Sequence, residues 1–307
     1  TQNQSSAASD VYKRQVQGPL FDLPAGEVLG LVGFEQRKEA VDYRVDGGSK
    51  ADVYRAGYSA DISGAFSTSD VYYELFVPLL GNGFGELSLG GVSLLKGVDL
   101  EYSFRELDNS LAGVDEADNL GLNIRFTDDL RIRLNQQNAV RAPSMGELFQ
   151  PVVAVSSFVS DPCDQSFIDA GPNPEVRRAN CLADAQRYGV DITNWESFAK
   201  NATVQGRAGG NVNLANESAE AQGYGLVFQP SFVPGELSLA VDKIVIDIED
   251  AITSYTATQI MNACYDSTSF PNNPFCGQFF RGDDFQLLRG AGEVAYIAGQ
   301  VNAAIYE

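Results

Sequence analysis

The chain has 307 residues, of which 44% are hydrophobic, and a formal net charge of -20. This hydrophobic content argues against a disordered chain, and the excess of 41 acidic over 21 basic residues argues against a nucleic-acid partner, because acidic groups repel phosphate. Histidine is absent, which removes Ser-His-Asp and Cys-His catalysis and histidine-ligated zinc or haem. This removes the commonest catalytic machinery but does not exclude an enzyme. Our prediction is that the chain is not an enzyme and binds no cofactor or metal. No run of about 18–20 apolar residues occurs, which argues against a membrane protein built from spanning helices.

The first fifteen residues differ in character from the rest. Residues 1–15 are polar and lack the apolar core of a secretory signal segment. Within them, Asp10–Gln15 (DVYKRQ) resembles a translated adapter end from sequencing libraries. We therefore predict that residues 1–15 are a non-native leader outside the fold, with a natural polar linker as the alternative, and assign them no function.

Two-residue periodicity is the main structural signal in the remaining chain. The clearest case is a pair of segments, 119–127 and 130–137, each with one apolar and one polar face, separated by a short turn at Asp128 and Asp129. Segments of about ten residues with this pattern are typical of transmembrane barrel strands, whose apolar side chains face lipid and whose polar side chains face a wet lumen. We predict an all-β fold, a partial antiparallel transmembrane β-barrel over residues 16–307. The same alternation marks segments 28–39, 71–79, 98–105 and 224–228.

Connection lengths point to the same architecture. Outer-membrane barrels alternate short periplasmic turns with long extracellular loops. The sequence predicts long extracellular loops at about 143–218 and about 252–292, and it places all four cysteines in them. It predicts tight turns at 24–26, 81–83, 128–129 and 230–235.

One strand carries a conflict. Leu237, Leu239 and Val241 form an apolar face, but the next residue on that face is Lys243. A lysine facing mid-bilayer lipid would cost about 2–4 kcal/mol. Either a β-bulge near Asp242 reverses the register, or the strand has left the membrane at that point, which we favour. We predict that Lys243 does not face mid-bilayer lipid.

The four cysteines fall into two local pairs without the C-x-x-C spacing of a redox or zinc site. Four cysteines allow three connectivities, and we favour Cys163 with Cys181 and Cys264 with Cys276 because local pairing closes the shortest loops. Such disulfides persist in an oxidising compartment such as the periplasm or the cell surface. The alternative is four buried free thiols.

Several stretches resemble TonB-dependent outer-membrane receptors of proteobacterial type. Residues 16–38 (VQGPLFDLPAGEVLGLVGFEQRK) resemble a barrel hairpin of that family, and Ala139–Phe149 (AVRAPSMGELF) resembles the strand end that leads into a large extracellular loop. The cysteine loop around Cys163 and Cys181 resembles the disulfide-bearing loop of one branch. Residues 227–252 and 259–276 continue the resemblance, which covers nearly everything from Val16 to Glu307.

The resemblance implies a 22-stranded barrel with a plugged lumen, located in the cell outer membrane. It implies uptake of a scarce nutrient, energised by the TonB complex, with outer-membrane lipid and lipopolysaccharide around the barrel. Siderophores, cobalamin and oligosaccharides all use this architecture, and no residue selects among them. We expect this chain to be about half of the barrel, without the TonB box, the plug, the early strands and the closing C-terminal strands.

Candidate contacts with a ligand or the plug follow from this interpretation. Aromatic and cationic loop residues could stack on a ligand, although a small loop core under the Cys163–Cys181 bridge is the favoured alternative; they are Trp195, Phe198, Phe279, Phe280 and Arg281. Charged strand residues should face the lumen and contact the plug or a ligand, with a solvated charge ladder as the alternative. They are Glu35, Arg37, Glu39, Glu74, Glu101, Arg105, Arg125, Arg131 and Arg133, and the last three of these lie near a short turn.

Other interpretations remain open. Asp161, Asp164 and Asp169 could bind calcium, but they lack the glycine and terminal glutamate of a known calcium loop, and we favour solvated surface acids. The competing functions are a passive porin-like channel, an outer-membrane hydrolase that works without histidine, and a soluble secreted β-sandwich.

Overall fold

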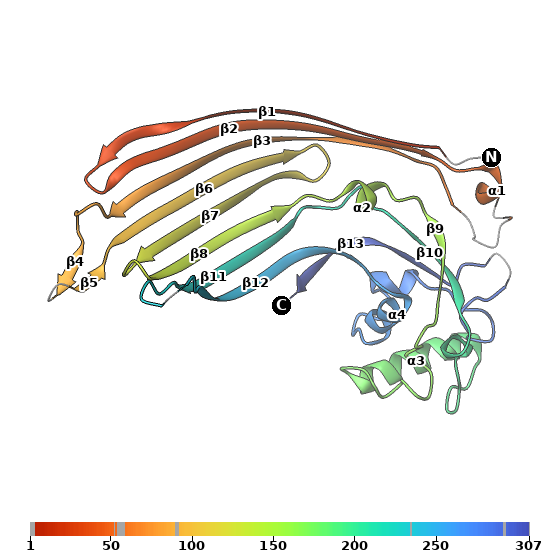
Figure 1. Cartoon of the computed structure of the whole chain (residues 1–307). Coiled ribbons are helices and arrows are strands. Elements are labelled where there is room, and N and C mark those ends of the chain that lie inside the picture. The colour runs from red at the N-terminus through yellow and green to blue at the C-terminus, as the bar shows by residue number, and fades with distance from the viewer. Residues whose placement is uncertain are drawn as a thin grey trace.

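The protein, described as a computed structural model, is a strongly curved β-sheet with a helical domain at one end (Figure 1). The structure describes residues 4–51, 53, 59–89, 92–233, 235–290 and 293–306. Eleven strands form the sheet in the order β1-β2-β3-β6-β7-β8-β11-β12-β13-β10-β9. Neighbouring strands are antiparallel except β10 and β13, which are parallel. The prediction of an all-β, partial antiparallel barrel is confirmed, and the sheet does not close on itself in the described residues.

Nine long strands build the wall of the sheet. They are β1 (Gln4–Leu23), β2 (Gly26–Arg44), β3 (Ile62–Leu80), β6 (Gly97–Asn109), β7 (Gly113–Arg125), β8 (Leu130–Arg141), β11 (Glu217–Phe228), β12 (Leu239–Ser254) and β13 (Tyr296–Tyr306). Four short strands are β4 (Leu87–Leu89), β5 (Val92–Leu95), β9 (Val153–Ser157) and β10 (Val204–Gly209). The helices are α1 (Gly47–Lys50), α2 (Met145–Phe149), α3 (Pro174–Tyr188) and α4 (Ala257–Tyr265), with 3-10 turns η1 (Phe198–Lys200) and η2 (Pro274–Gly277). No helix in the described ranges is both long and apolar enough to cross a membrane.

The N-terminal segment is part of the sheet. Residues 4–15 continue β1 and pair residue by residue with β2, from Gln4 opposite Arg44 to Gln15 opposite Gly33. The expectation that residues 1–15 lie outside the fold is therefore wrong for residues 4–15, because their backbone completes the β2 ladder. Residues 1–3 lie outside the described part, and the foreign origin of the segment stays a prediction.

The two faces of the wall have opposite chemistry. Leu100, Leu122, Leu134 and Tyr224 lie side by side on one face of β6, β7, β8 and β11. Polar residues occupy the other face, which is the concave one. On that polar face, the chain passes from the end of β8 through residues 142–146 and α2 to contact β3, across the two intervening strands β6 and β7. So short a segment can span that width only if the face is concave.

The border of the apolar face runs diagonally across the sheet. Residues that lie opposite one another on neighbouring strands form a row. Toward the loop end, the outer face of each strand changes from apolar to polar. From β3 to β12, this change lies either in the same row as on the preceding strand or one row closer to the short turn. The last apolar residues before the first polar residue on this face are Val71, Phe104, Leu120, Leu134, Tyr224 and Val241, on β3, β6, β7, β8, β11 and β12. On β12, a single exposed apolar residue, Val245, follows beyond Lys243. The border descends four two-residue rows over five strand spacings, which corresponds to a strand tilt of roughly 50°. A transmembrane barrel strand tilts by about 35–45°.

Connections alternate in length, with two departures from the predicted pattern. The connections at residues 142–216 and 255–295 lie at the loop end and contain α2, α3 and α4 (Figure 1). Gly81 and Phe84 form the predicted tight turn, but the chain continues through the β4–β5 hairpin before β6. At the loop end, β6 and β7 are joined by only residues 110–112.

Lys243 lies in an unbroken ladder. β11 and β12 pair in one register from Ser218 opposite Glu249 to Phe228 opposite Leu239, so the predicted alternative of a bulge near Asp242 is wrong. Lys243 therefore shares the outer face with Val241 and is the first polar residue above the apolar border on β12.

Candidate functional site

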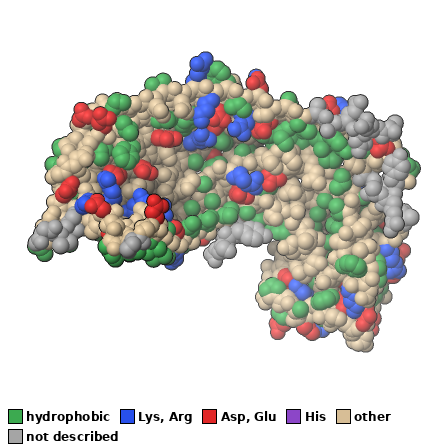
Figure 2. Space-filling model, viewed as in Figure 1, with side chains coloured by type: hydrophobic (Ala, Val, Ile, Leu, Met, Phe, Trp, Pro, Cys, Tyr) green, Lys and Arg blue, Asp and Glu red, His purple; other side chains and the backbone are tan. Residues whose placement is uncertain are grey.

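The concave face of the wall carries the predicted charged residues. The ladder register places all nine of them, from Glu35 to Arg133, on this one face. Figure 2 shows acidic and basic side chains gathered side by side on the hollowed face of the sheet. Contact of these residues with a plug or a ligand stays a prediction.

Five of these nine charges form an ion pair with another residue of the wall. Glu35 lies 3.2 Å from Arg37 and 3.7 Å from Lys13. The remaining pairs are Arg105–Asp70 at 3.4 Å, Arg125–Asp99 at 3.3 Å and Arg133–Asp242 at 2.9 Å. Such half-exposed pairs each contribute about 0–1 kcal/mol, so they order the wall more than they stabilise it.

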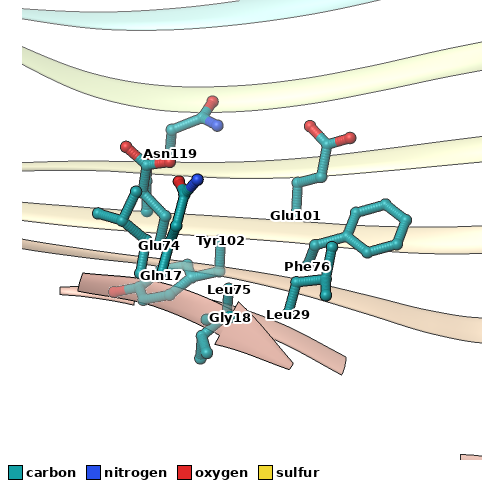
Figure 3. Close-up of a pocket in the computed structure, with 12 residues that line it drawn as sticks. Gln17, Gly18, Leu29, Glu74, Leu75, Phe76, Glu101, Tyr102 and Asn119 are labelled. Atoms are coloured by element: carbon teal, nitrogen blue, oxygen red, sulfur yellow. The ribbon is translucent and has the colours of Figure 1, made fainter. Parts of the chain in front are cut away.

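Polar side chains of the wall, together with apolar ones such as Leu29 and Phe76, line a hollow between β1 and β7 (Figure 3). Gln17, Glu74, Glu101 and Asn119 point to the same side of the sheet, whereas Leu75 and Tyr102 point to the other. The hollow has a volume of about 680 Å³, within the range of small-molecule sites.

A short helix covers the loop end of the concave face. Ser144 caps α2 by accepting a hydrogen bond from the Glu147 backbone, and the Glu147 carboxylate accepts one from the Ser144 backbone, which explains why the helix begins there. Arg141 links this corner together, because its guanidinium donates to Glu147 and to Glu217 at 3.0–3.2 Å. The ring of Phe149 lies against Gly64, where a β-carbon would come within 2.3 Å of it.

The two long connections form one domain. We call it the loop domain, residues 153–209, 255–290 and 293–299. Its disulfides join Cys163 to Cys181 and Cys264 to Cys276, the pairing that the sequence favoured. A single apolar core contains both disulfides and residues from both connections, such as Val159 and Met261. β13 ties the domain to the wall, since its first half pairs with β10 and its second half with β12.

An arginine occupies the centre of this core. The Arg281 guanidinium donates to both carboxylate oxygens of Asp161 at 2.8 and 2.9 Å and to the Tyr265 hydroxyl at 2.9 Å, and the side chains of Arg281 and Asp161 are 1% and 0% exposed. Burial acts to lower the pKa of Arg281, but attraction by Asp161 and Tyr265 outweighs it and leaves the pKa raised. The Phe285 ring lies 4.1 Å from the guanidinium, and the Trp195 ring 5.8 Å.

The structure places most of the predicted ligand-contacting residues in this core. Arg281 is paired and buried, so the predicted ligand contact does not fit it, and Phe279 is only 8% exposed. Trp195 packs against Phe285 with ring centroids 5.2 Å apart, as the alternative of a loop core requires. Phe198 packs on the core under Arg289, and Phe280 keeps 37% of its surface exposed. Ligand contact by Phe280 stays a prediction.

The candidate calcium acids are engaged by protein groups. Asp161 and Asp164 are fully buried, so the expectation of solvated surface acids is wrong for both. Burial acts to raise the pKa of Asp164, but hydrogen bonds from the Ser166 and Ser197 backbones and from Lys200 outweigh it and leave the pKa lowered. Asp169 is exposed and pairs with Arg178. Within the described ranges, no three acidic or cysteine residues are arranged to hold a metal ion.

Two important residues escaped the sequence patterns. Asp242, the partner of Arg133, lies in a segment whose alternation was ambiguous. Phe285, at the centre of the loop domain, follows two aspartates and has a left-handed backbone with φ of 63°. The local sequence around Asp242 and Phe285 does not reveal the importance of either residue without knowledge of the fold.

No protein-family model matches the sequence, and no curated protein sequence matches it. The structure, however, is similar to solved receptors. It matches a mutant of the ferric enterobactin receptor PfeA from Pseudomonas aeruginosa with a TM-score of 0.57 and 12% identity, over 98% of this chain and 32% of the receptor. It matches the siderophore receptor PirA from Acinetobacter baumannii with a TM-score of 0.52 and 14% identity, over 98% of this chain and 33% of that one. PirA from Pseudomonas aeruginosa gives a TM-score of 0.53 and 12% identity, over 98% and 38%. The chain spans about a third of the length of these proteins, and it has the fold of the corresponding part of a siderophore-receptor β-barrel.

Proposed function

We propose that this chain is part of a TonB-dependent outer-membrane receptor for energised uptake of a scarce nutrient. The diagonal apolar border on the outer face of the wall supports the membrane location, and the structural similarity to solved siderophore receptors favours a receptor over a passive channel. A soluble sheet has no reason to shift the end of its apolar face by four rows in one direction over five strand spacings, whereas tilted strands that cross a flat membrane produce such a shift.

The chemistry around that border supports a membrane location. Tyr73 packs against Tyr102 and Phe104 near the border, with ring centroids 5.9 and 5.4 Å apart, as in the aromatic girdles of outer-membrane barrels. Beyond these rings the outer face becomes acidic, with Glu106 and Asp118. Carboxylates at this height suit contact with lipopolysaccharide through bridging divalent cations.

The concave face supports a role in receiving a ligand or a plug. It combines ordered charge pairs with two hollows of small-molecule size, and the loop domain lies at one end of the sheet (Figure 1). A loop domain with two disulfides at the end of a polar wall is suited to first contact with an external ligand. Siderophores, cobalamin and oligosaccharides remain candidate nutrients under this proposal.

The alternative is a passive porin-like channel, which would share the wall and the border. The test is to recover the whole gene from its source DNA and express it in a host with and without TonB. Uptake that requires TonB supports the receptor. Flux that is equal in both hosts, together with steady conductance across a planar bilayer, would exclude energised transport in favour of the channel.

A further inference from the structure

A hairpin extends beyond the strand ends at the turn end of the wall, which is the end opposite the loop domain (Figure 1). It consists of β4 and β5, which form a two-stranded sheet, and we call residues 84–89 and 92–95 the leucine hairpin. A two-stranded hairpin is at best marginally stable in water. We therefore expect its apolar residues to pack against something.

The leucine hairpin is amphipathic and exposed. Leu87 and Leu89 lie on one face of β4 with 57% and 73% of their surface exposed, whereas Ser88 lies on the other face. Phe84 and Leu94 are exposed as well. Single exposed leucines are common on protein surfaces, but a continuous apolar patch marks a contact surface.

Charge is almost absent from the same segment. Residues 81–95 contain one charged side chain, Glu86, although charged residues make up 20% of the chain. The Glu86 carboxylate accepts a hydrogen bond from the Gly83 backbone at 2.8 Å, so this charge helps to close the turn at the start of the hairpin. The segment therefore lacks the charges by which exposed strands avoid association in water.

The hairpin begins against the apolar outer face of the wall. Leu80, at the end of β3, lies opposite Val98, which shares the outer face with Leu100. A β-carbon at Gly85 would come within 2.3 Å of the Leu80 side chain, so the start of the hairpin lies directly against this leucine. The leucine hairpin is therefore continuous with the apolar face.

A second connection at the turn end has the same character. Phe232, between β11 and β12, is 76% exposed, and its ring centroid lies 6.5 Å from that of Phe228 on the outer face. Leu237 and Leu239 follow and are also exposed. Aromatic and apolar side chains gathered at one end of a barrel wall are typical of the boundary between lipid tails and headgroups.

We propose that the leucine hairpin is a membrane-contact element whose leucine face lies in the lipid interface at the turn end of the wall. The proposal concerns neither the nutrient nor TonB, but it rests on the proposed membrane location. In the described part of the chain, β4 and β5 each have one strand neighbour, so their outer edges leave N–H and C=O groups that hydrocarbon would not satisfy. The hairpin therefore lies at the hydrated boundary between headgroups and acyl chains, as amphipathic segments do, and not deeper.

The test places one environment-sensitive fluorophore on the full-length receptor in lipid nanodiscs. Leu89→Cys carries the dye, and Ser88→Cys, on the opposite face of the same strand, is the matched control. The four cysteines of this chain are joined in disulfides and do not compete for the dye. Lipid with a spin label near the top of its acyl chain quenches dyes in the interface, and iodide quenches dyes in water. We expect lipid quenching at position 89 to exceed that at position 88 by at least about twofold, and iodide quenching to have the reverse order.

Three results would overturn the inference. Iodide quenching at both positions without lipid quenching would place the hairpin in water. Protection of position 89 from both quenchers would mean that protein covers the leucine face. Equal lipid quenching at both positions would mean that the leucine face has no special role.

A charged substitution tests whether the leucine face holds the hairpin in the interface. With the dye at Leu87→Cys, Leu89→Glu should reduce lipid quenching by about half or more, because a carboxylate resists transfer out of water. Ser88→Glu adds the same charge to the opposite face and should leave the quenching nearly unchanged. Equal effects of the two glutamates would count against the proposal.

A dye at Leu226→Cys separates this inference from the proposed membrane location. Leu226 lies on the outer face of β11, within the apolar band, and is 40% exposed. Lipid quenching at position 226 without lipid quenching at position 89 would refute the hairpin proposal alone. Absence of lipid quenching at position 226 would refute the membrane location itself.

Discussion

Replacing Arg281 by methionine should destabilise the loop domain severely. The substitution keeps an apolar side chain of similar length inside the aromatic residues but leaves Asp161 fully buried without its partner. Breaking a buried ion pair from one side costs about 3–5 kcal/mol, because the remaining charge loses its compensation. Trp195, the only tryptophan, lies 5.8 Å from this guanidinium and reports unfolding of the domain directly by fluorescence in a denaturant titration.

Two further variants make the measurement decisive. Arg178→Met removes a cation from an exposed pair with Asp169 on the same domain and should cost no more than about 1 kcal/mol. The double variant Arg281→Met with Asp161→Leu removes both buried charges and should be more stable than Arg281→Met alone. If Arg281→Met and Arg178→Met shift the midpoint equally, the burial argument is refuted.

Three other outcomes follow from the structure. Breaking the Cys163–Cys181 disulfide by a Cys163→Ala, Cys181→Ala double substitution should lower loop-domain stability by about 3 kcal/mol, measured by the same fluorescence titration; an unchanged midpoint would contradict this. Burial raises the pKa of Tyr265 above its ordinary value of 10, so the stability that Tyr265 contributes is full below pH 10 and is lost as pH rises further. Tyr265→Phe should remove that alkaline loss, and persistence of the full loss in a pH series of unfolding midpoints would count against it. Gly33→Ala should destabilise the wall by about 1–3 kcal/mol, because its β-carbon would lie 2.2 Å from the ring of Tyr72, whereas Gly18→Ala, with nothing within 4 Å, should be nearly neutral in heat-modifiability gels.

The sequence predicted the wall well because its two faces differ in chemistry. In the proposed membrane location, lipid on one side and water on the other would select opposite residues at alternate positions, and the alternation is visible in single segments such as 119–137. Residues 4–15 could not be identified as a strand from alternation, because this polar strand at the edge of the sheet has no apolar face. It also missed the β4–β5 hairpin, which follows a turn that already looked complete.

The loop domain could be predicted only in part. Cysteine spacing was enough to suggest the disulfides, because each closes a local loop of 18 or 12 residues. The Asp161–Arg281 pair joins residues 120 positions apart, and nothing in either local sequence distinguishes them from the surface charges nearby. Long-range charge pairing is set by the packing of the two connections, so Arg281 was a plausible ligand contact until that packing was known.

Lys243 shows how the tilt of the strands resolves a conflict that a single strand leaves open. Its ladder partners in the same row include Tyr224, then Leu134 and Leu122, all apolar. In a sheet with untilted strands, one row would lie at one depth, and Lys243 would share the lipid with Leu122. When the strands tilt by roughly 50°, residues of one row lie at different depths. Each step to the next strand changes the depth by about the length of two residues along a strand. Lys243 is three strands away from Leu122, so it lies at the polar border while Leu122 lies within the apolar band. In the proposed membrane location, the cost of about 2–4 kcal/mol for a lysine in mid-bilayer would therefore not arise, and no bulge is needed to avoid it.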